Sequence, residues 1–208
     1  MSTLILCAGN QDRFDGGIYK QMLLIHGEPL LFRTIRQCEK GFTSVVTKYG
    51  GFNPPSPYQT TCYLMAHQAR WTCETIYNTR HLWSPDGQTR ILLGDVMFTD
   101  EAIATIMQNR ESMRFYGDTR DFFAISFSAQ YAPVLSSTLQ SLVSKCKTPG
   151  TAHCRLLHLY RFMGMPDARL VLIGDDTQDF DTNQDYEQWS RGISKNRLKN
   201  PPQQRRRS

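Results

Sequence analysis

The chain has 208 residues, of which 40% are hydrophobic, and a formal net charge of +5. This length is enough for one domain with a sizeable core. No apolar run reaches the roughly 18 residues that would span a bilayer. The first three residues are too few for the basic start of a signal peptide. We therefore expect a cytoplasmic protein with no membrane span.

The positive charge is concentrated at the C-terminal end of the chain. Six of the 24 basic residues and none of the acidic ones follow residue 194, so residues 1–194 hold 18 basic and all 19 acidic residues. Residues 195–208 also contain two prolines and little to bury, a composition typical of disorder. We expect a folded domain over 1–194 and a disordered basic tail over 195–208. This tail is either solvated or contacts nucleic acid or another anionic surface.

Strand-like and helix-like segments alternate along the predicted domain. The first, residues 3–9, is a continuous apolar run, which is typical of a strand buried on both faces of a parallel sheet. The next, residues 29–41, is an amphipathic helix ending at Gly41. The following segments, in chain order, are a strand at 43–50, a helix at 71–84, a strand at 89–96, a helix at 100–111 capped by Asp100, a strand at 122–129, helices at 133–145 and 152–163, a strand at 169–175 and a helix at 182–193. This alternation predicts an α/β fold, a three-layer Rossmann-like sandwich whose mostly parallel sheet has helices on both faces.

The six cysteines form no C-x-x-C pair and fall in apolar or helical patterns, so we expect all of them to be reduced. One group resembles a metal site, and it consists of Cys146, His153, Cys154 and His158. Its spacing matches none of the common zinc patterns, and Thr148-Pro149-Gly150 predicts a turn within it. We therefore interpret these residues as part of an ordinary helix rather than as zinc ligands.

The loop after the first predicted strand is the first candidate binding site, because ligands of parallel sheets bind at the carboxyl ends of the strands. Gly9 allows close approach to the main chain, and Arg13 and Lys20 provide two cations for a polyanion such as a triphosphate. The loop has neither the G-x-x-x-x-G-K-[ST] nor the G-x-G-x-x-G pattern. By spacing alone, a polar loop without a ligand remains an equal alternative.

Three motifs carry a resemblance to a known family. Residues 4–14 read LILCAGNQDRF and are followed by Lys20 and by GEPLL at 27–31. This resembles the signature of the sugar-phosphate and MobA-like nucleotidyltransferases, an apolar strand with A-G-x-G-x-R, then P-K-x-L-L and G-K-P-L-L. Downstream, ILLGDVMF resembles the strand that ends in the metal-binding aspartate of that family, and DFDTNQDYEQW resembles its C-terminal acidic segment. The chain departs from the signature at Gln11, Tyr19 and Glu28, where the family has glycine, proline and lysine.

The resemblance implies a nucleotide-diphospho-sugar transferase fold and a set of site residues. The implied nucleotide-binding residues are Leu6, Cys7, Ala8, Gly9, Asn10, Gln11, Arg13 and Lys20. Arg13 and Lys20 are also the implied catalytic residues. The implied ligands of a Mg²⁺ cofactor are Asp95 and Asp181, assisted by Asp179. The implied substrates are a nucleoside triphosphate (NTP) and a phosphorylated acceptor.

These residue types suit nucleotidyl transfer, in which a phosphate oxygen of the acceptor attacks the α-phosphorus and pyrophosphate leaves. Because the nucleophile is already an anion, the reaction needs aligned positive charge rather than a general base. Mg²⁺ binds oxygen ligands, usually one or two carboxylates together with phosphate oxygens and water. The alternatives are a guanylyltransferase acting on a pterin cofactor, a glycosyltransferase using an NDP-sugar, and a non-catalytic nucleotide-binding relative.

The remaining site predictions are less specific. Residues 47–58 and 72–75 occupy positions where relatives recognise the base, and neither indicates which base. Phe127 and Ser128 lie at the end of the predicted strand at 122–129 and are expected to face the acceptor. Six acidic residues crowd the stretch 175–187. Either some of them are metal ligands, or the stretch is a solvated turn in which Asp181 or Thr182 caps the last helix.

Overall fold

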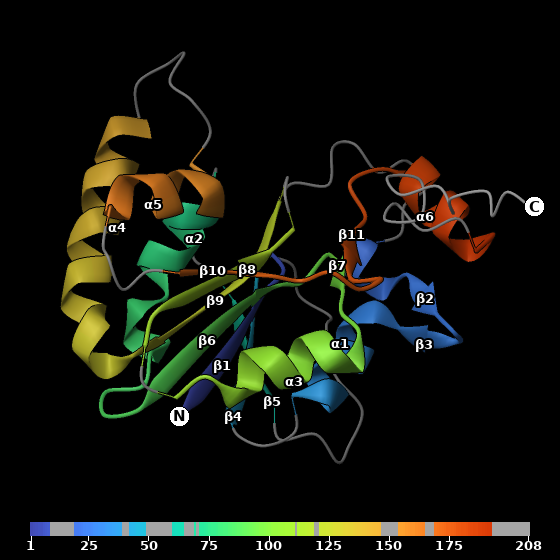
Figure 1. Cartoon of the computed structure of the whole chain (residues 1–208), viewed down its shortest axis with the longest axis horizontal. Helices are drawn as coiled ribbons and strands as arrows, with labels where there is room; N and C mark the ends of the chain where they lie inside the picture. The colour runs from blue at the N-terminus through green and yellow to red at the C-terminus, as the bar shows by residue number, and fades with distance from the viewer. Residues whose placement is uncertain are drawn as a thin grey trace, which may run out of the picture.

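A seven-stranded sheet forms the centre of the molecule, with the strand order β10-β8-β9-β6-β1-β4-β5 (Figure 1). The computed structural model describes residues 1–8, 19–38, 42–48, 60–64, 69, 71–110, 112–118, 121–146, 154–164 and 169–192. The sheet strands are β1 (Ser2–Leu6), β4 (Phe42–Thr47), β5 (Thr60–Leu64), β6 (Gln88–Leu93), β8 (Arg114–Gly117), β9 (Phe122–Ser128) and β10 (Arg169–Leu172). All of them run in one direction except β9, which is antiparallel to both of its neighbours.

Helices cover both faces of this sheet, as Figure 1 shows. They are α1 (Leu30–Gln37), α2 (Thr72–Asn78), α3 (Asp100–Gln108), α4 (Ala132–Cys146), α5 (Leu156–Met163) and α6 (Asn183–Ser190). α2, α4 and α5 lie against one face, and α1 and α3 lie against the other. The predicted α/β class, with a mostly parallel sheet between two helical layers, is confirmed.

The burial of β1 explains its continuous apolar run. Leu4 and Leu6 pack into the core beneath α2 and α4, whereas Ile5 and Cys7 pack into the core beneath α1. Successive side chains of a strand point to opposite faces, so a strand with helices on both sides needs apolar residues at every position. The sequence pattern of β1 thus directly reflects its central place in the sheet.

Two strands of the main sheet, β5 and β8, are not among the predicted elements. Short strands add two ribbons outside the sheet, β2 (Leu24–Ile25) with β3 (Glu28–Pro29), and β7 (Val96–Met97) with β11 (Gln178–Asp179). The unpredicted β8 forms a hairpin with β9 and thereby reverses β9.

The reversal of β9 corrects one site prediction. Ser128 pairs with Gln88 at the start of β6, at the end of the sheet away from the carboxyl end of β6. Phe127 is fully buried, and its ring lies 4.9 Å from that of Trp83. The prediction that Phe127 and Ser128 face an acceptor is therefore wrong, because it assumed that β9 runs parallel to the other strands.

The N-terminus of α3 also differs from the prediction. Thr99, not Asp100, is the N-cap, because its Oγ1 accepts a hydrogen bond from the Ala102 N–H at 3.1 Å. A hydroxyl one residue before the first helical turn satisfies an N–H that has no partner within the helix. Asp100 lies in the first turn, where a carboxylate favours the positive end of the helix dipole.

The expectation that all cysteines are reduced is wrong as well. Cys146, the last residue of α4, forms a disulfide with Cys154, which lies two residues before α5. The packing of α5 on α4 brings the two Cα atoms to 6.5 Å, a separation that a disulfide spans. Two of the four residues considered as zinc ligands are thus joined to each other, and His153 lies outside the described residues.

The tail at 195–208 lies outside the described residues. Within the described ones, no helix combines the length and the apolar character needed to cross a membrane.

Candidate active site

The candidate site lies where β1 and β6 end side by side. The Gly94 N–H donates to the Leu6 carbonyl at 2.9 Å, and the Cys7 N–H donates to the Val46 carbonyl at 2.7 Å. A Cβ on Gly94 would meet Cys7 Sγ at 2.5 Å and the Leu6 carbonyl oxygen at 2.9 Å. A glycine is therefore needed for this close approach. Asp95 follows immediately, beyond the edge of the sheet.

The predicted nucleotide-binding residues fall into two groups. Leu6, Cys7 and Ala8 are buried at the end of β1, so their side chains belong to the core and their backbone leads toward the site. Gly9, Asn10, Gln11 and Arg13 lie outside the described residues.

Lys20 connects the predicted metal-binding carboxylates. It begins a 3₁₀ turn at Lys20–Met22, and 4% of its surface is exposed. Its Nζ lies 4.0 Å from Asp95 Oδ2 and 3.9 Å from Asp181 Oδ1. Three charged residues predicted from motifs far apart in the sequence thus converge on one point.

The short β7–β11 ribbon brings Asp181 to Asp95. Asp179 pairs with Val96, and the Phe180 N–H donates to the Asp95 carbonyl at 3.2 Å. Phe180 is fully buried and packs with Met97 and residues of the β2–β3 ribbon. Because side chains alternate along an extended segment, Asp179 and Asp181 lie on the side opposite Phe180, toward the site.

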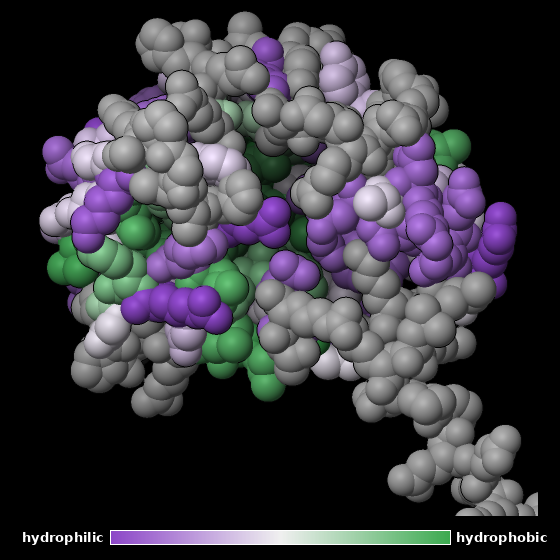
Figure 2. All heavy atoms as spheres, turned by 90° about the horizontal axis from the view of Figure 1, so that it is seen from above, coloured by the Kyte–Doolittle hydropathy of each residue, from purple (hydrophilic) through white to green (hydrophobic). Residues whose placement is uncertain are grey.

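A pocket of about 440 Å³ opens beside these carboxylates, and we call it the carboxylate pocket. Its lining residues are Thr72, Leu93, Asp95, Val96, Asp121, Phe122, Phe123, Arg155, Leu156, Leu157, His158, Asp179 and Asp181. Figure 2 looks down on the end of the molecule where β1 and β6 finish, and shows a hollow with hydrophobic atoms between the α4–α5 side and the hydrophilic surface around α6. The volume is of the size that holds a small-molecule ligand.

The far side of the pocket holds polar residues that the sequence interpretation missed. Asp121 reaches it because β9 is reversed and begins at this edge. A turn precedes β9, in which the Asp121 N–H donates to Asp118 Oδ1 at 2.8 Å and the Asp118 N–H donates to the Asp121 carbonyl at 2.9 Å. An aspartate-rich turn between two apolar runs is a hairpin signal that could have revealed this reversal.

Arg155 and His158 were also missed as pocket residues. The Arg155 N–H donates to His158 Nδ1 at 3.4 Å. With Nδ1 accepting, the neutral ring carries its hydrogen on Nε2, which is then a donor. No sequence pattern marks these two residues, because they reach the pocket through the packing of α5.

The structure divides the acidic stretch at 175–187. The carboxylate of Asp175 accepts from the Thr99 hydroxyl at 2.5 Å and from the Thr177 N–H at 2.8 Å, which fastens the loop to the start of α3. Thr182 is the N-cap of α6, and Asp185 accepts from its N–H at 2.8 Å in a capping box. Asp175 and Asp185 therefore have structural roles, and Thr182 acts as the predicted cap.

The departure from the family signature at Glu28 has a local explanation. Glu28 accepts two hydrogen bonds from Arg36 of α1, at 3.1 and 2.8 Å. This bond to Arg36 lowers the pKa of the Glu28 carboxyl. Glu28 is thus paired within its own ribbon-to-helix unit and does not line the carboxylate pocket.

The residues present fit a Mg²⁺ ion. No group of three His, Cys, Asp or Glu side chains within the described part of the chain is gathered closely enough to hold a metal ion. Mg²⁺ does not need such a cage, because it commonly takes one or two carboxylates and completes its shell with phosphate oxygens and water. Asp95 and Asp181, each within about 4 Å of the Lys20 ammonium, are the carboxylates that would supply such ligands.

Comparison with known proteins adds to this geometry. No family model matches the chain, and no curated protein matches its sequence. Among solved structures, the CTP:phosphocholine cytidylyltransferase from Streptococcus pneumoniae matches with a TM-score of 0.59 and 13% identity, over 93% of this chain and 99% of that chain. The inositol-1-phosphate CTP transferase from T. maritima matches with a TM-score of 0.62 and 10% identity, over 88% of this chain and 90% of that one.

The chain shares the fold of these solved structures. A third match, the nucleoside-diphosphate-sugar pyrophosphorylase from Vibrio cholerae, has a TM-score of 0.61 and 10% identity and covers 92% of this chain and 100% of that one. The coverage extends over nearly all of both chains, which agrees with the resemblance of the sequence motifs over residues 4–189. At this level of identity the likeness establishes the fold, and the substrates have to be inferred from the residues of the site.

Proposed function

We propose that the chain is a Mg²⁺-dependent nucleotidyltransferase. It transfers a nucleoside monophosphate from an NTP to a phosphorylated acceptor, such as a sugar phosphate, and releases pyrophosphate. The observation that carries the proposal is the buried Lys20 ammonium between Asp95 and Asp181, at the edge of a pocket and beyond the ends of β1 and β6.

Each of these residues has a role that this reaction requires. The attacking phosphate oxygen is already ionised, so the site must align and neutralise negative charge rather than remove a proton. Lys20 supplies a cation in a largely buried position, where attraction to an anion is stronger than at the surface. Asp95 and Asp181 would hold the Mg²⁺ ion, with Asp179 assisting, and the bound ion would neutralise charge on the reacting phosphates.

The nucleotide is assigned to the segment that follows β1. In this proposal the backbone from Leu6 to Gln11 and the Arg13 side chain cradle the triphosphate, and Lys20 lies at the end of the same segment. The acceptor then occupies the carboxylate pocket, which adjoins the carboxylates.

The test is pyrophosphate release with Mg²⁺, each NTP and a pool of phosphorylated acceptors. Product is expected with one or a few NTPs, and chelation of the metal abolishes it. Asp95→Asn, beyond the end of β6, loses turnover. The matched control Asp86→Asn, at an exposed residue just before the start of β6, keeps it.

Two results would overturn the proposal. One is full turnover by Asp95→Asn, and the other is a melting temperature that no NTP raises, because a ligand of the native state must stabilise it. Consumption of an NDP-sugar without pyrophosphate release would indicate a glycosyltransferase instead.

A further inference from the structure

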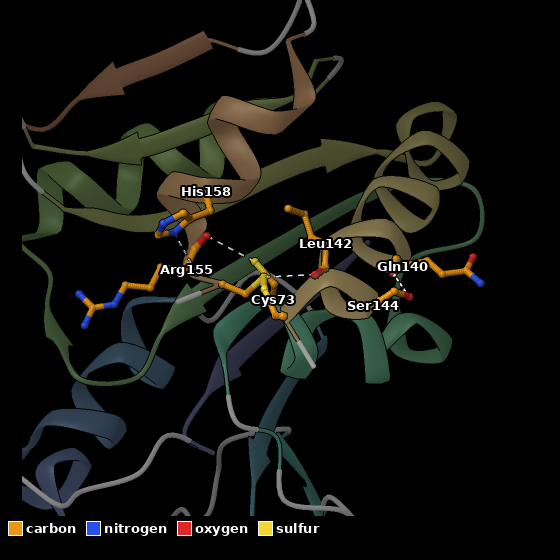
Figure 3. The surroundings of a disulfide bond; sticks show 8 residues. Cys73, Gln140, Leu142, Ser144, Arg155 and His158 are labelled. Atoms are coloured by element: carbon orange, nitrogen blue, oxygen red, sulfur yellow. Dashed lines mark hydrogen bonds between the residues drawn. A yellow bond between two sulfur atoms is a disulfide. The ribbon is translucent and has the colours of Figure 1, made fainter. Parts of the chain in front are cut away.

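The Cys146–Cys154 disulfide lies directly behind one wall of the carboxylate pocket. Cys154 is fully buried in the core formed by α2, α4 and α5, and the next residue, Arg155, is exposed and lines the pocket. Figure 3 shows the Arg155 side chain extending away from the disulfide. A change at Cys154 is therefore one residue from a pocket-lining cation.

Cys73 of α2 ties the same two residues to the core. Its N–H donates to the Cys154 carbonyl at 3.1 Å, and its thiol donates to the Arg155 carbonyl at 3.4 Å (Figure 3). Cys154 Sγ also lies 3.6 Å from the Leu142 carbonyl of α4. The entry to α5 is thus held by the disulfide, by these weak hydrogen bonds and by the packing of the buried Cys154 and Leu156 in the core.

The wall that begins at Arg155 presents hydrogen-bond donors to the pocket. The guanidinium carries five N–H donors and no acceptor. His158 Nδ1 already accepts from the Arg155 backbone, which leaves Nε2 as a donor. Both side chains lie at the start of α5, where the helix dipole also favours an anion. This wall faces the same pocket as Asp95 and Asp181, so its donors lie across the pocket from those two carboxylates and share their own side with the Asp121 carboxylate.

We propose that Arg155 and His158 bind an anionic group of the acceptor, and that the Cys146–Cys154 disulfide is a redox-sensitive brace that positions them. This inference rests on the proposed function, because it assigns the acceptor to the carboxylate pocket. Arg155 and His158 are specificity-determining residues, and Cys146 and Cys154 are positioning residues.

Opening the brace requires a dithiol reductant. The S–S bond breaks, each sulfur gains one electron and one proton, and the dithiol is oxidised to its own disulfide. Cys73 does not substitute for the reductant, because thiol–disulfide exchange needs a thiolate. Burial raises the pKa of the Cys73 thiol to about 12, so it stays protonated at neutral pH.

Reduction should weaken acceptor binding and spare nucleotide binding. Once the bond is open, the Arg155 and His158 side chains become ordered only when the acceptor binds. The conformational entropy lost in that step lowers the affinity for the acceptor by roughly three- to tenfold. Lys20, Asp95 and Asp181 are held by other elements, so the KM for the NTP should stay within about twofold.

The experiment uses the full chain, the NTP and the acceptor identified by pyrophosphate release, and dithiothreitol as the reductant. We expect the acceptor KM to rise roughly three- to tenfold on reduction and in the Cys146→Ser/Cys154→Ser double variant. Dithiothreitol should have no further effect on that variant. Cys38→Ser, which alters a buried thiol on the other face of the sheet, is the matched control and should respond to the reductant as the wild type does.

A second variant separates recognition from general damage to the fold. Arg155→Ala should raise the acceptor KM at least as much as reduction does, Arg155→Lys should recover part of the loss, and reduction should add little to Arg155→Ala. Amide exchange at Cys73, whose N–H donates to the Cys154 carbonyl, should become faster on reduction.

The outcomes distinguish the two proposals. No product from oxidised wild-type protein with any NTP would count against the proposed function. Product formation with an acceptor KM that reduction leaves unchanged, or with equal rises in both KM values, would overturn the brace. Alkylation of Cys146 and Cys154 before any reductant is added would overturn it as well.

Discussion

Asp95 and Arg155 line the same pocket, yet the chain holds them by different means. Asp95 follows a central strand and is joined by a backbone hydrogen bond to Phe180, beside a buried lysine. Arg155 begins a peripheral helix, and a disulfide anchors the residue before it. The carboxylate side is thus fixed by the sheet, whereas the α5 side depends on helix packing and one covalent bond.

This difference matches the separate roles proposed for the two sides, transfer on the carboxylate side and acceptor recognition on the α5 side. Group transfer needs charges held to within a fraction of an ångström, and the sheet provides that rigidity. Acceptor recognition can vary without disturbing the transfer step if it depends on a separate element. Four predictions follow, from the largest expected effect to the smallest.

The largest effect is expected when a carboxylate is removed from one side of the pocket or from the other. Asp95→Ala should lower kcat by about 10³-fold or more, because it removes a proposed metal ligand. Asp121→Ala, on the α5 side, should change mainly the acceptor KM, by less than about tenfold. Steady-state pyrophosphate release measures both, and equal losses of kcat in the two variants would end the distinction between the two sides.

Lys20→Met should lower kcat/KM for the NTP by roughly 10²-fold, since it removes a buried cation near the proposed triphosphate site. The variant keeps a side chain of similar length in the same space. Lys145→Met, which alters a lysine of α4 outside the pocket, serves as a comparison. A Lys20→Met variant with normal kcat/KM would remove this residue from the catalytic set.

Gly94→Ala tests the close approach of β6 to β1. The added Cβ would meet Leu6 and Cys7 at 2.9 Å or less, so the free energy of unfolding should fall by about 1–3 kcal/mol. Gly174→Ala is the control, because nothing lies within 4 Å of the added Cβ there. Urea denaturation of both variants should separate them, and equal stabilities would contradict the packing described for this junction.

The smallest effect is expected at the Glu28–Arg36 ion pair, outside the pocket. The hydrogen bond from Arg36 lowers the pKa of Glu28 in the folded state. The stabilisation that this pair gives the folded state is therefore present above the pKa of Glu28 in the unfolded chain, and it is lost as the pH falls through the pKa in the folded state. Glu28→Gln should therefore cost less than about 1 kcal/mol near neutral pH and almost nothing in strong acid. Urea denaturation near neutral pH and in strong acid checks this. A destabilisation by Glu28→Gln that is larger in acid would contradict the lowered pKa of Glu28.

Much of the carboxylate side could be predicted from the sequence, because motif order places residues at strand ends. The run at 4–14, the strand that ends before Asp95 and the acidic segment around Asp181 each carry a local signal, and a parallel sheet collects such ends at one edge. The structure brings Lys20, Asp95 and Asp181 together as that reasoning expects.

The α5 side could not be predicted in the same way. The assumption that β9 is parallel placed Phe127 and Ser128 at the wrong end of the sheet. The direction of this strand depends on its pairing with β8 rather than on its local residues. Cys146 and Cys154 look like two ordinary helical thiols in the sequence, since their proximity arises when α5 packs on α4.

The sequence by itself therefore determined the alternation of strands and helices, the central apolar strand and the identity of the charged residues that follow the strands, because each leaves a local pattern of hydrophobicity or charge. Tertiary structure alone decided the direction of β9, the disulfide, and the placement of Asp121, Arg155 and His158 in the pocket. Those features depend on contacts between segments far apart in the chain, and such contacts leave no periodic trace in either segment.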